Sequence, residues 1–168
     1  ILSDSPPEKD VQWSDQGMLA SYKFIQKFWA LHQKIKQKIQ LSKKEETNEF
    51  DESIEEFTNH VLNKINISLD KFSYNVIVAN LHEIYNFLNK IANNDKLAKN
   101  LLNNYIKILT IMIPITPHLA SECISELHKN KVISWPVIDN KYLQNKENNI
   151  VVQINGKKRS LISTQNSM

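Results

Sequence analysis

The sequence contains little glycine, proline or cysteine, with two, five and one of these residues in a chain of 168. Because tight turns between strands depend on glycine and proline, this scarcity argues against a multi-stranded β architecture. A lone cysteine excludes an internal disulfide and supplies too few thiols for a zinc cluster. No run of about 18 apolar residues and no signal-peptide pattern occurs, so we expect a cytoplasmic protein without a membrane span.

The chain also lacks the patterns that carry most catalytic and metal chemistry. No two of its five histidines have the paired spacing of metal ligands. With only Gly17 and Gly156 available, a glycine-rich phosphate loop cannot form. No Ser-His-Asp or Cys-His arrangement stands out, and Cys123 is expected to be an ordinary buried residue. We therefore expect no catalytic residue, no metal and no cofactor in this chain.

What the sequence does contain is helical periodicity, in a chain that is 41% hydrophobic and long enough for one core. Apolar residues recur at three- and four-residue spacing, with polar breaks between the runs. The pattern predicts an all-α bundle of about five helices, near residues 15–41, 51–71, 75–92, 95–113 and 117–127. Candidate N-cap residues precede them: Ser14 or Asp15, then Asp51 or a capping box of Ser53 with Glu56, then Asn94 or Asp95, and finally Thr116 before Pro117.

The last thirty residues have a different pattern. Residues 150–154 alternate as a strand, Asn155-Gly156 favours a tight turn, and residues 157–162 form the return limb. Because an isolated hairpin is marginally stable, we expect the beginning of a further small domain. We therefore divide the chain into a connector (1–14), a helical bundle (15–140) and a linker with an incomplete C-terminal domain (141–168). Since the chain begins without methionine, we expect it to be a piece of a longer protein.

Charge is unevenly distributed along the chain. Residues 16–44 contain seven lysines and no acid, whereas residues 45–56 contain seven acids and no lysine. At about 100° per residue, four lysines of the first predicted helix fall within about 60° of one another, away from the centre of its apolar face: Lys23, Lys27, Lys34 and Lys38. Such a ridge suits a phosphate backbone, although a lysine-rich solvated face is the ordinary alternative.

Three tryptophans and a basic tail complete the candidate binding residues. Trp29 is either a stacking platform for a base or a residue at the edge of the core. Trp135 precedes Pro136, and Trp13 follows Pro7 by six residues; both tryptophans are expected to pin loops to the bundle. A second RNA contact is expected at Lys157, Lys158 and Arg159, within residues 141–168, which carry a net charge of +4.

Several segments resemble leucyl-tRNA synthetases of the bacterial type, which are class I enzymes. Residues 3–29 resemble the junction between the catalytic core and the anticodon-binding helix bundle, and residues 75–89 resemble the third helix of that bundle. Residues 112–122, with Pro114-Ile115-Thr116-Pro117-His118, match a motif that the leucine, isoleucine and valine enzymes share. Residues 151–159 resemble the start of the small C-terminal domain. The first and last segments favour the leucine enzyme.

The resemblance implies a tRNA-binding, anticodon-binding-type bundle whose parent is a leucine–tRNA ligase. The family's catalytic signatures and editing domain are absent from this chain, so the resemblance places ATP-dependent leucylation in the rest of the parent. It implies a monomer whose partners are the tRNA for leucine and the parent's catalytic and editing domains. Contacts to RNA are expected mostly at phosphate and sugar. The alternatives are the equivalent domain of a valyl-, isoleucyl- or methionyl-tRNA synthetase, or a helical module that binds protein through residues 45–56.

Overall fold

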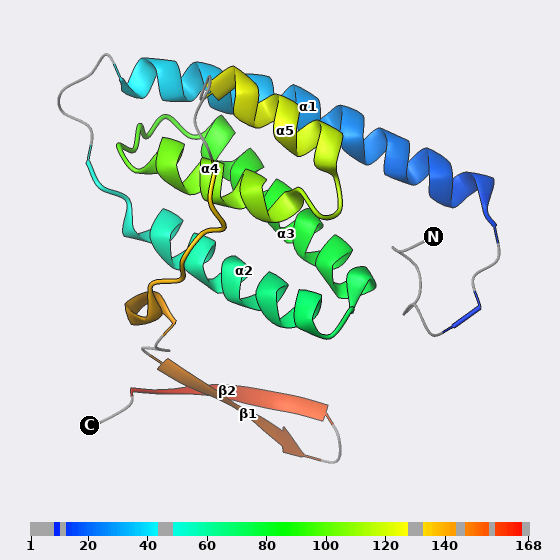
Figure 1. The fold of residues 1–168 in the computed structure, drawn as a ribbon. Helices are drawn as coiled ribbons and strands as arrows, with labels where there is room; N and C mark the ends of the chain where they lie inside the picture. Colours follow the sequence, from blue (N-terminus) through cyan, green and yellow to red (C-terminus); the bar gives the residue numbers. More distant parts are fainter. Residues whose placement is uncertain are drawn as a thin grey trace. The chain divides into compact units, whose positions relative to one another are not determined.

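The computed structural model describes residues 9–10, 13–43, 49–127, 133–143, 147–154 and 157–165. It divides into two compact units, Ile1–Ile138 and Asp139–Met168. The described part of the first unit contains five α-helices (Figure 1): α1 (Asp15–Ser42), α2 (Glu52–Asp70), α3 (Tyr74–Asn93), α4 (Leu101–Met112) and α5 (Pro117–Leu127). The all-α bundle predicted from the apolar periodicity is therefore confirmed.

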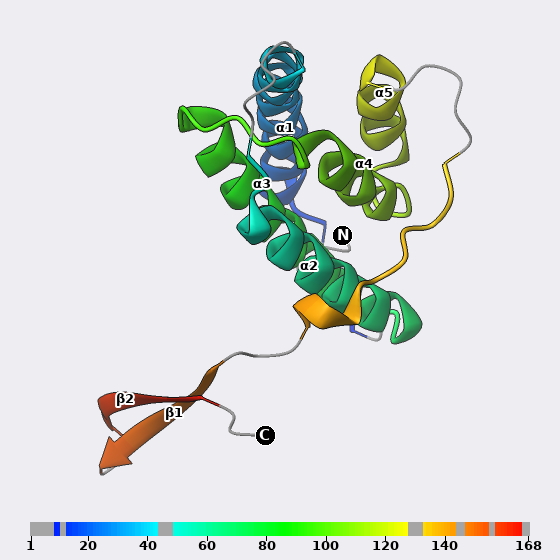
Figure 2. The same cartoon turned by 90° about the vertical axis from the view of Figure 1, so that its left-hand side faces the viewer.

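The long helix α1 packs between two others. It contacts α3 on one flank and α5 on the other, while α2 packs against α3 and α4, and α4 packs against α5. Figure 2 shows α1 almost end-on, with α3 and α5 on its two sides. One face of α1 therefore faces the core, and the opposite face remains available to solvent.

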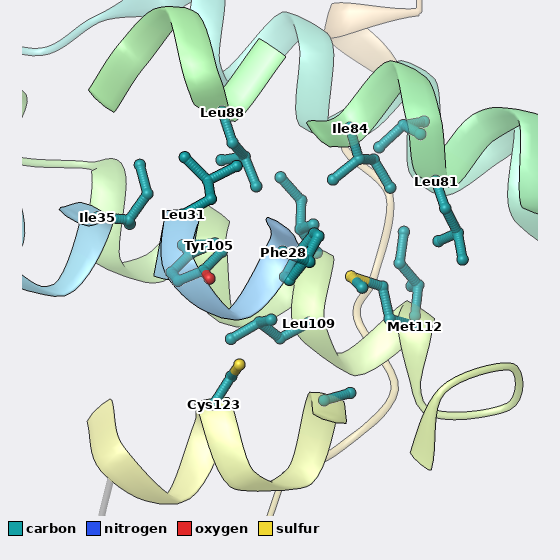
Figure 3. Close-up of a cluster of buried hydrophobic side chains, with 14 of the residues drawn as sticks. Phe28, Leu31, Ile35, Leu81, Ile84, Leu88, Tyr105, Leu109, Met112 and Cys123 are labelled. Carbon is teal, nitrogen blue, oxygen red and sulfur yellow. The ribbon is translucent and has the colours of Figure 1, made fainter. Parts of the chain in front are cut away.

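All five α-helices contribute buried side chains to the core, part of which Figure 3 shows. Its residues share almost complete burial, and they include Phe28, Leu31 and Ile35 of α1, Leu81, Ile84 and Leu88 of α3, Tyr105, Leu109 and Met112 of α4, and Cys123 of α5. Burial raises the pKa of the Cys123 thiol to about 12, so the thiol stays protonated. The expectation that Cys123 is an ordinary buried residue is confirmed.

Two of the predicted helix starts are set by local capping. The Ser14 hydroxyl accepts a hydrogen bond from the Gly17 backbone N–H at 3.2 Å, which satisfies one unpaired donor of the first turn of α1. At α2 the cap is Asp51, whose carboxylate accepts from the Ser53 backbone N–H at 3.0 Å. The Ser53 hydroxyl donates to the same carboxylate at 2.6 Å. The alternative capping box of Ser53 with Glu56 is therefore wrong.

The predicted start of α4 near residue 95 is also wrong, because tertiary pairing replaces local capping there. The Lys99 N–H donates to the Glu49 carbonyl at 3.2 Å, beside a parallel bridge between Glu49 and Ala98. The Asn100 side chain then exchanges two hydrogen bonds with the backbone of Asp51, at 2.9 and 3.2 Å. This pairing holds residues 98–100 out of the helix, which begins at Leu101.

The fifth helix begins as predicted, with Pro117 at its first position. The Thr116 hydroxyl, however, donates to the Met112 carbonyl at 3.3 Å, so it provides a hydrogen-bond donor for a carbonyl at the end of α4.

The second unit contains a short 3₁₀ turn, η1 (Asn140–Tyr142), and two antiparallel strands, β1 (Glu147–Ile154) and β2 (Lys157–Gln165). Ile150 lies opposite Ile162, and the register shifts between Val152 and Gln153. A hairpin is predicted at this position, and the strands extend beyond the predicted limits at both outer ends. The predicted Asn155-Gly156 turn lies outside the described residues.

Candidate nucleic-acid interface

Three of the four predicted lysines form an exposed row on the solvent face of α1. Lys23, Lys27 and Lys34 are all exposed, and they fall within about 40° of one another around the helix axis. Within the described residues none of the three forms a salt bridge. We call these three residues the lysine row. Their ammonium groups are available for contacts with an anionic partner.

Lys38 does not belong to this row, and its predicted place on an exposed ridge is wrong. Its side chain is only 7% exposed, and its ammonium group donates to the backbone carbonyl and, at 2.9 Å, to the side-chain oxygen of Asn94. Lys38 lies on the flank of α1 that is nearest the core, where the end of α3 passes beside it. The burial lowers its pKa. The ammonium group therefore links the end of α1 to the end of α3.

Lys36 is also engaged within the protein. Its ammonium group lies 2.9 Å from the Glu126 carboxylate of α5, which also accepts from Gln33 at 3.1 Å and from the imidazole of His32 at 3.0 Å. These bonds, led by the one from Lys36, lower the pKa of Glu126 to about 2. The helical spacing predicted the burial of His32 but carried no signal for its partners, which are more than 70 residues away.

The His32 imidazole links α1, α4 and α5. Its Nε2 faces the ionised Glu126 carboxylate, which can only accept, so Nε2 carries the proton. Nδ1 then accepts from the Tyr105 hydroxyl at 2.9 Å. Burial lowers the pKa of His32 and raises the pKa of Tyr105. Both groups therefore keep the neutral forms that this chain of hydrogen bonds requires.

Trp29 lies above this network at the surface of α1. Its side chain is 36% exposed, and its ring stacks on His32 with 5.5 Å between centroids and 29° between planes. The Trp135 indole donates to the Asn66 side chain of α2 at 3.1 Å, which confirms its predicted role in pinning a loop. Trp13 is exposed and donates to Asp15 at 2.9 Å, at the first residue of α1.

Two acids of the segment 45–56 form hydrogen bonds within the bundle. The first two acids of the segment, Glu45 and Glu46, lie outside the described residues. Asp51 caps α2, and the Glu55 carboxylate, whose side chain is 14% exposed, accepts from the Asn104 amide at 2.7 Å. These acids attach the start of α2 to the start of α4, which weakens the alternative of a free acidic surface that binds protein.

The predicted second contact lies in the other unit. Lys157, Lys158 and Arg159 open β2, where Lys157 is opposite Ile154 and Lys158 is opposite Gln153. Their side chains are outside the described residues, so their contact with RNA stays a prediction. Across the part of the chain that the structure describes, no three potential metal ligands come together and no helix is long and apolar enough to cross a membrane.

Lys38→Ala is expected to reduce the free energy of unfolding by about 1 to 2 kcal/mol, because it leaves the Asn94 carbonyl without its charged donor. Lys34→Ala, at an exposed position of the same helix, is expected to change it by less than about 0.5 kcal/mol. Urea unfolding of the two variants measures the difference. Equal losses would contradict the structural role of Lys38.

Acidification is expected to destabilise the bundle in two stages. The pKa of His32 is lowered from 6.5 in the folded protein, so the unfolded chain binds a proton first and stability falls as the pH drops below about 6.5. The pKa of Glu126 is lowered from 4.5 to about 2, so its contribution is complete above pH 4.5 and declines toward pH 2. Urea unfolding between about pH 7.5 and about pH 5 measures the first stage. His32→Asn should flatten that part of the profile, and a variant that keeps the wild-type pH dependence would contradict this assignment.

Comparisons of the sequence with a family model and with known proteins indicate the same family. The family model for the anticodon-binding domain of tRNA ligase matches residues 51–168. A leucine–tRNA ligase of Petrotoga mobilis is 34% identical and matches 100% of this chain and 22% of its own length. One from Bartonella tribocorum is 32% identical over 97% of this chain and 19% of its own length. The resemblance to leucyl-tRNA synthetases is thus confirmed, and the chain spans about a fifth of the length of these relatives.

A solved structure has the same fold. It is a leucyl-tRNA synthetase, agnB2 LeuRS of Agrobacterium radiobacter K84, in a ternary complex with tRNA and LeuAMS. The TM-score is 0.74 with 16% sequence identity, and the match covers 99% of this chain and 22% of that one.

Proposed function

Because the chain belongs to the family of anticodon-binding domains of tRNA ligases, we propose that it is the tRNA-binding bundle of a leucyl-tRNA synthetase. The bundle holds the body of the tRNA for leucine, so that the acceptor end reaches a catalytic domain outside this chain. That domain uses ATP to activate leucine and transfers the leucyl group to the tRNA, while an editing domain completes the parent, which works as a cytoplasmic monomer.

The observation that carries this proposal is the lysine row on α1. Lys23, Lys27 and Lys34 present three exposed cations along about 16 Å of helix, at 1.5 Å per residue. No acid occurs between residues 16 and 44 to oppose them. A lysine ammonium group binds phosphate as a point charge and needs no particular base, so the row supports positioning of an RNA backbone without reading its sequence.

The test is a salt series with the intact chain. Binding to the tRNA for leucine and to an unrelated tRNA is measured between about 50 and about 300 mM KCl, and the logarithm of the association constant is plotted against the logarithm of salt concentration. We expect a straight line of negative slope, because bound lysines release the counterions of the RNA. We also expect tighter binding of the tRNA for leucine. Absence of salt-dependent binding to either tRNA would overturn the proposal.

A further inference from the structure

The solvent face of α1 carries three parallel strips of different chemistry. The first is the lysine row, Lys23, Lys27 and Lys34. Beside it lies an exposed, uncharged strip of Gln26, Ala30 and Gln37. Beyond that, at about 100° to 140° from the lysine row, lie the rings of Tyr22 and Trp29. We call this third pair the aromatic strip.

The two rings of the aromatic strip are arranged along the helix. Tyr22 is 59% exposed and Trp29 is 36% exposed. Seven residues separate them, so they lie about 10.5 Å apart along the axis and only about 20° apart around it. Burying rings of this size is favourable, so two that stay exposed on one strip form a surface suited to an aromatic ligand.

Trp29 is the outermost ring of a supported stack. Its indole lies on the His32 imidazole, which in turn lies on the Tyr105 ring with 5.8 Å between centroids and 30° between planes. Hydrogen bonds from Tyr105 and to Glu126 hold the imidazole from both sides. The inner rings therefore limit the tilt of the indole, and a platform held in this way loses little conformational freedom when a ligand stacks on it.

We propose that α1 binds unpaired RNA nucleotides, with their phosphates on the lysine row and their bases stacked on Tyr22 and Trp29. This inference rests on the proposed function and specifies the kind of RNA segment that the bundle holds. Lysines alone serve equally well for a duplex, whose bases are stacked on one another and hidden. An aromatic strip alongside the lysines is useful only for bases that leave the stack, and stacking on it requires no particular sequence.

The charge on α1 favours RNA over protein as the occupant of this strip. The helix has no acidic residue after Asp15, so a surface that pairs with it must be anionic or neutral. The strip between the lysine row and the rings is uncharged. The Gln26 amide donates to the Tyr22 hydroxyl at 2.9 Å, and the Gln37 amide can donate or accept hydrogen bonds. A nucleotide strand offers phosphate, polar sugar and aromatic base in that same order across its width.

The test compares two RNA probes, a single-stranded oligouridylate of about 8 nucleotides and a blunt RNA duplex. Tyr22→Ala and Trp29→Leu are each expected to weaken oligouridylate binding by about tenfold, while the salt slope and the affinity for the duplex stay unchanged. Phe72→Ala is the matched control, since it removes a 63% exposed ring from the turn between α2 and α3. Circular dichroism checks that each variant keeps its helices.

A second experiment measures the fluorescence of the Trp29 indole. In a variant with Trp13→Phe and Trp135→Phe, the fluorescence of Trp29 is expected to be quenched when oligouridylate binds, because a stacked base contacts the ring. A variant with Trp13→Phe and Trp29→Phe, which keeps only Trp135, should show no quenching.

The outcomes separate this inference from the proposed function. If the wild-type chain binds tRNA with a steep salt dependence while Tyr22→Ala and Trp29→Leu bind oligouridylate as the wild type does, the stacking inference is overturned and the proposed function stands. The same holds if tRNA binds and the Trp29 fluorescence does not change. If the wild-type chain binds no RNA at any salt concentration, both proposals fail together.

Discussion

Replacing Lys23, Lys27 and Lys34 together with alanine is expected to flatten the salt dependence of tRNA binding and to abolish most of the affinity at low salt. Each lysine that contacts a phosphate adds about 0.7 to about 0.9 to the steepness of the plot of log affinity against log salt concentration. Removing the row should therefore reduce the slope by about 2 to 3, because none of the three ammonium groups forms an ion pair within the described residues. Stability should change little, since all three positions are exposed.

The matched control removes the same charge from other parts of the bundle. Lys64 and Lys71 belong to α2 and its end, Lys90 belongs to α3, and all three are exposed. Lys64 forms a salt bridge with Glu83 at 2.9 Å, but an exposed pair of this kind contributes little to stability. A triple alanine variant at these positions should keep the wild-type slope to within about 1. If both triple variants lose the same slope, the effect comes from net charge and the lysine row is not a binding site.

Leaving Lys38 out of the first variant matters for its interpretation. The Lys38 ammonium group is already bonded to Asn94, and its release would add a structural defect to the loss of charge. A quadruple variant would confuse weaker RNA binding with partial unfolding. The three-lysine variant keeps the junction between the ends of α1 and α3 intact, so a changed slope reports on the RNA interface.

Local signals account for what the sequence predicted well. The burial of Phe28, Ile35 and Ile39 follows from helical spacing, and the start of α1 follows from a hydroxyl that reaches the third residue beyond it. Proline at the first position of α5 likewise acts within a single turn. The family resemblance led to the proposed tRNA-binding role, which no periodicity could supply.

Distant partners account for what the sequence did not predict. The start of α4 depends on Glu49, which is 50 residues before Lys99, and the position of Lys38 depends on Asn94. A helical projection places Lys38 with the other lysines, but it does not show which neighbouring helix covers that flank. The Glu126 network could not be predicted for the same reason, because Glu126 lies 90 or more residues from the three α1 side chains that bond to it.

His32→Ala is expected to cost about 3 to 4 kcal/mol of unfolding free energy, the largest loss we expect from a single polar residue of this bundle. The imidazole is fully buried, so its removal leaves a cavity beneath Trp29. It also leaves the Tyr105 hydroxyl without its acceptor and removes one of the donors to Glu126. Urea unfolding measures the loss, and His118→Ala, at an exposed position of α5, is the control that should change stability by less than about 0.5 kcal/mol.

A double-mutant cycle separates the hydrogen bond from the cavity. Tyr105→Phe alone leaves Nδ1 of His32 buried without a donor, which should cost about 1 to 2 kcal/mol. In a His32→Leu background, where the side chain is apolar and of similar size, the same Tyr105→Phe change should cost much less, because no acceptor remains to be satisfied. Equal costs in the two backgrounds would show that Tyr105 and His32 are not coupled. Coupling would establish that the imidazole beneath Trp29 is held by its partners, as a rigid stacking surface on α1 requires.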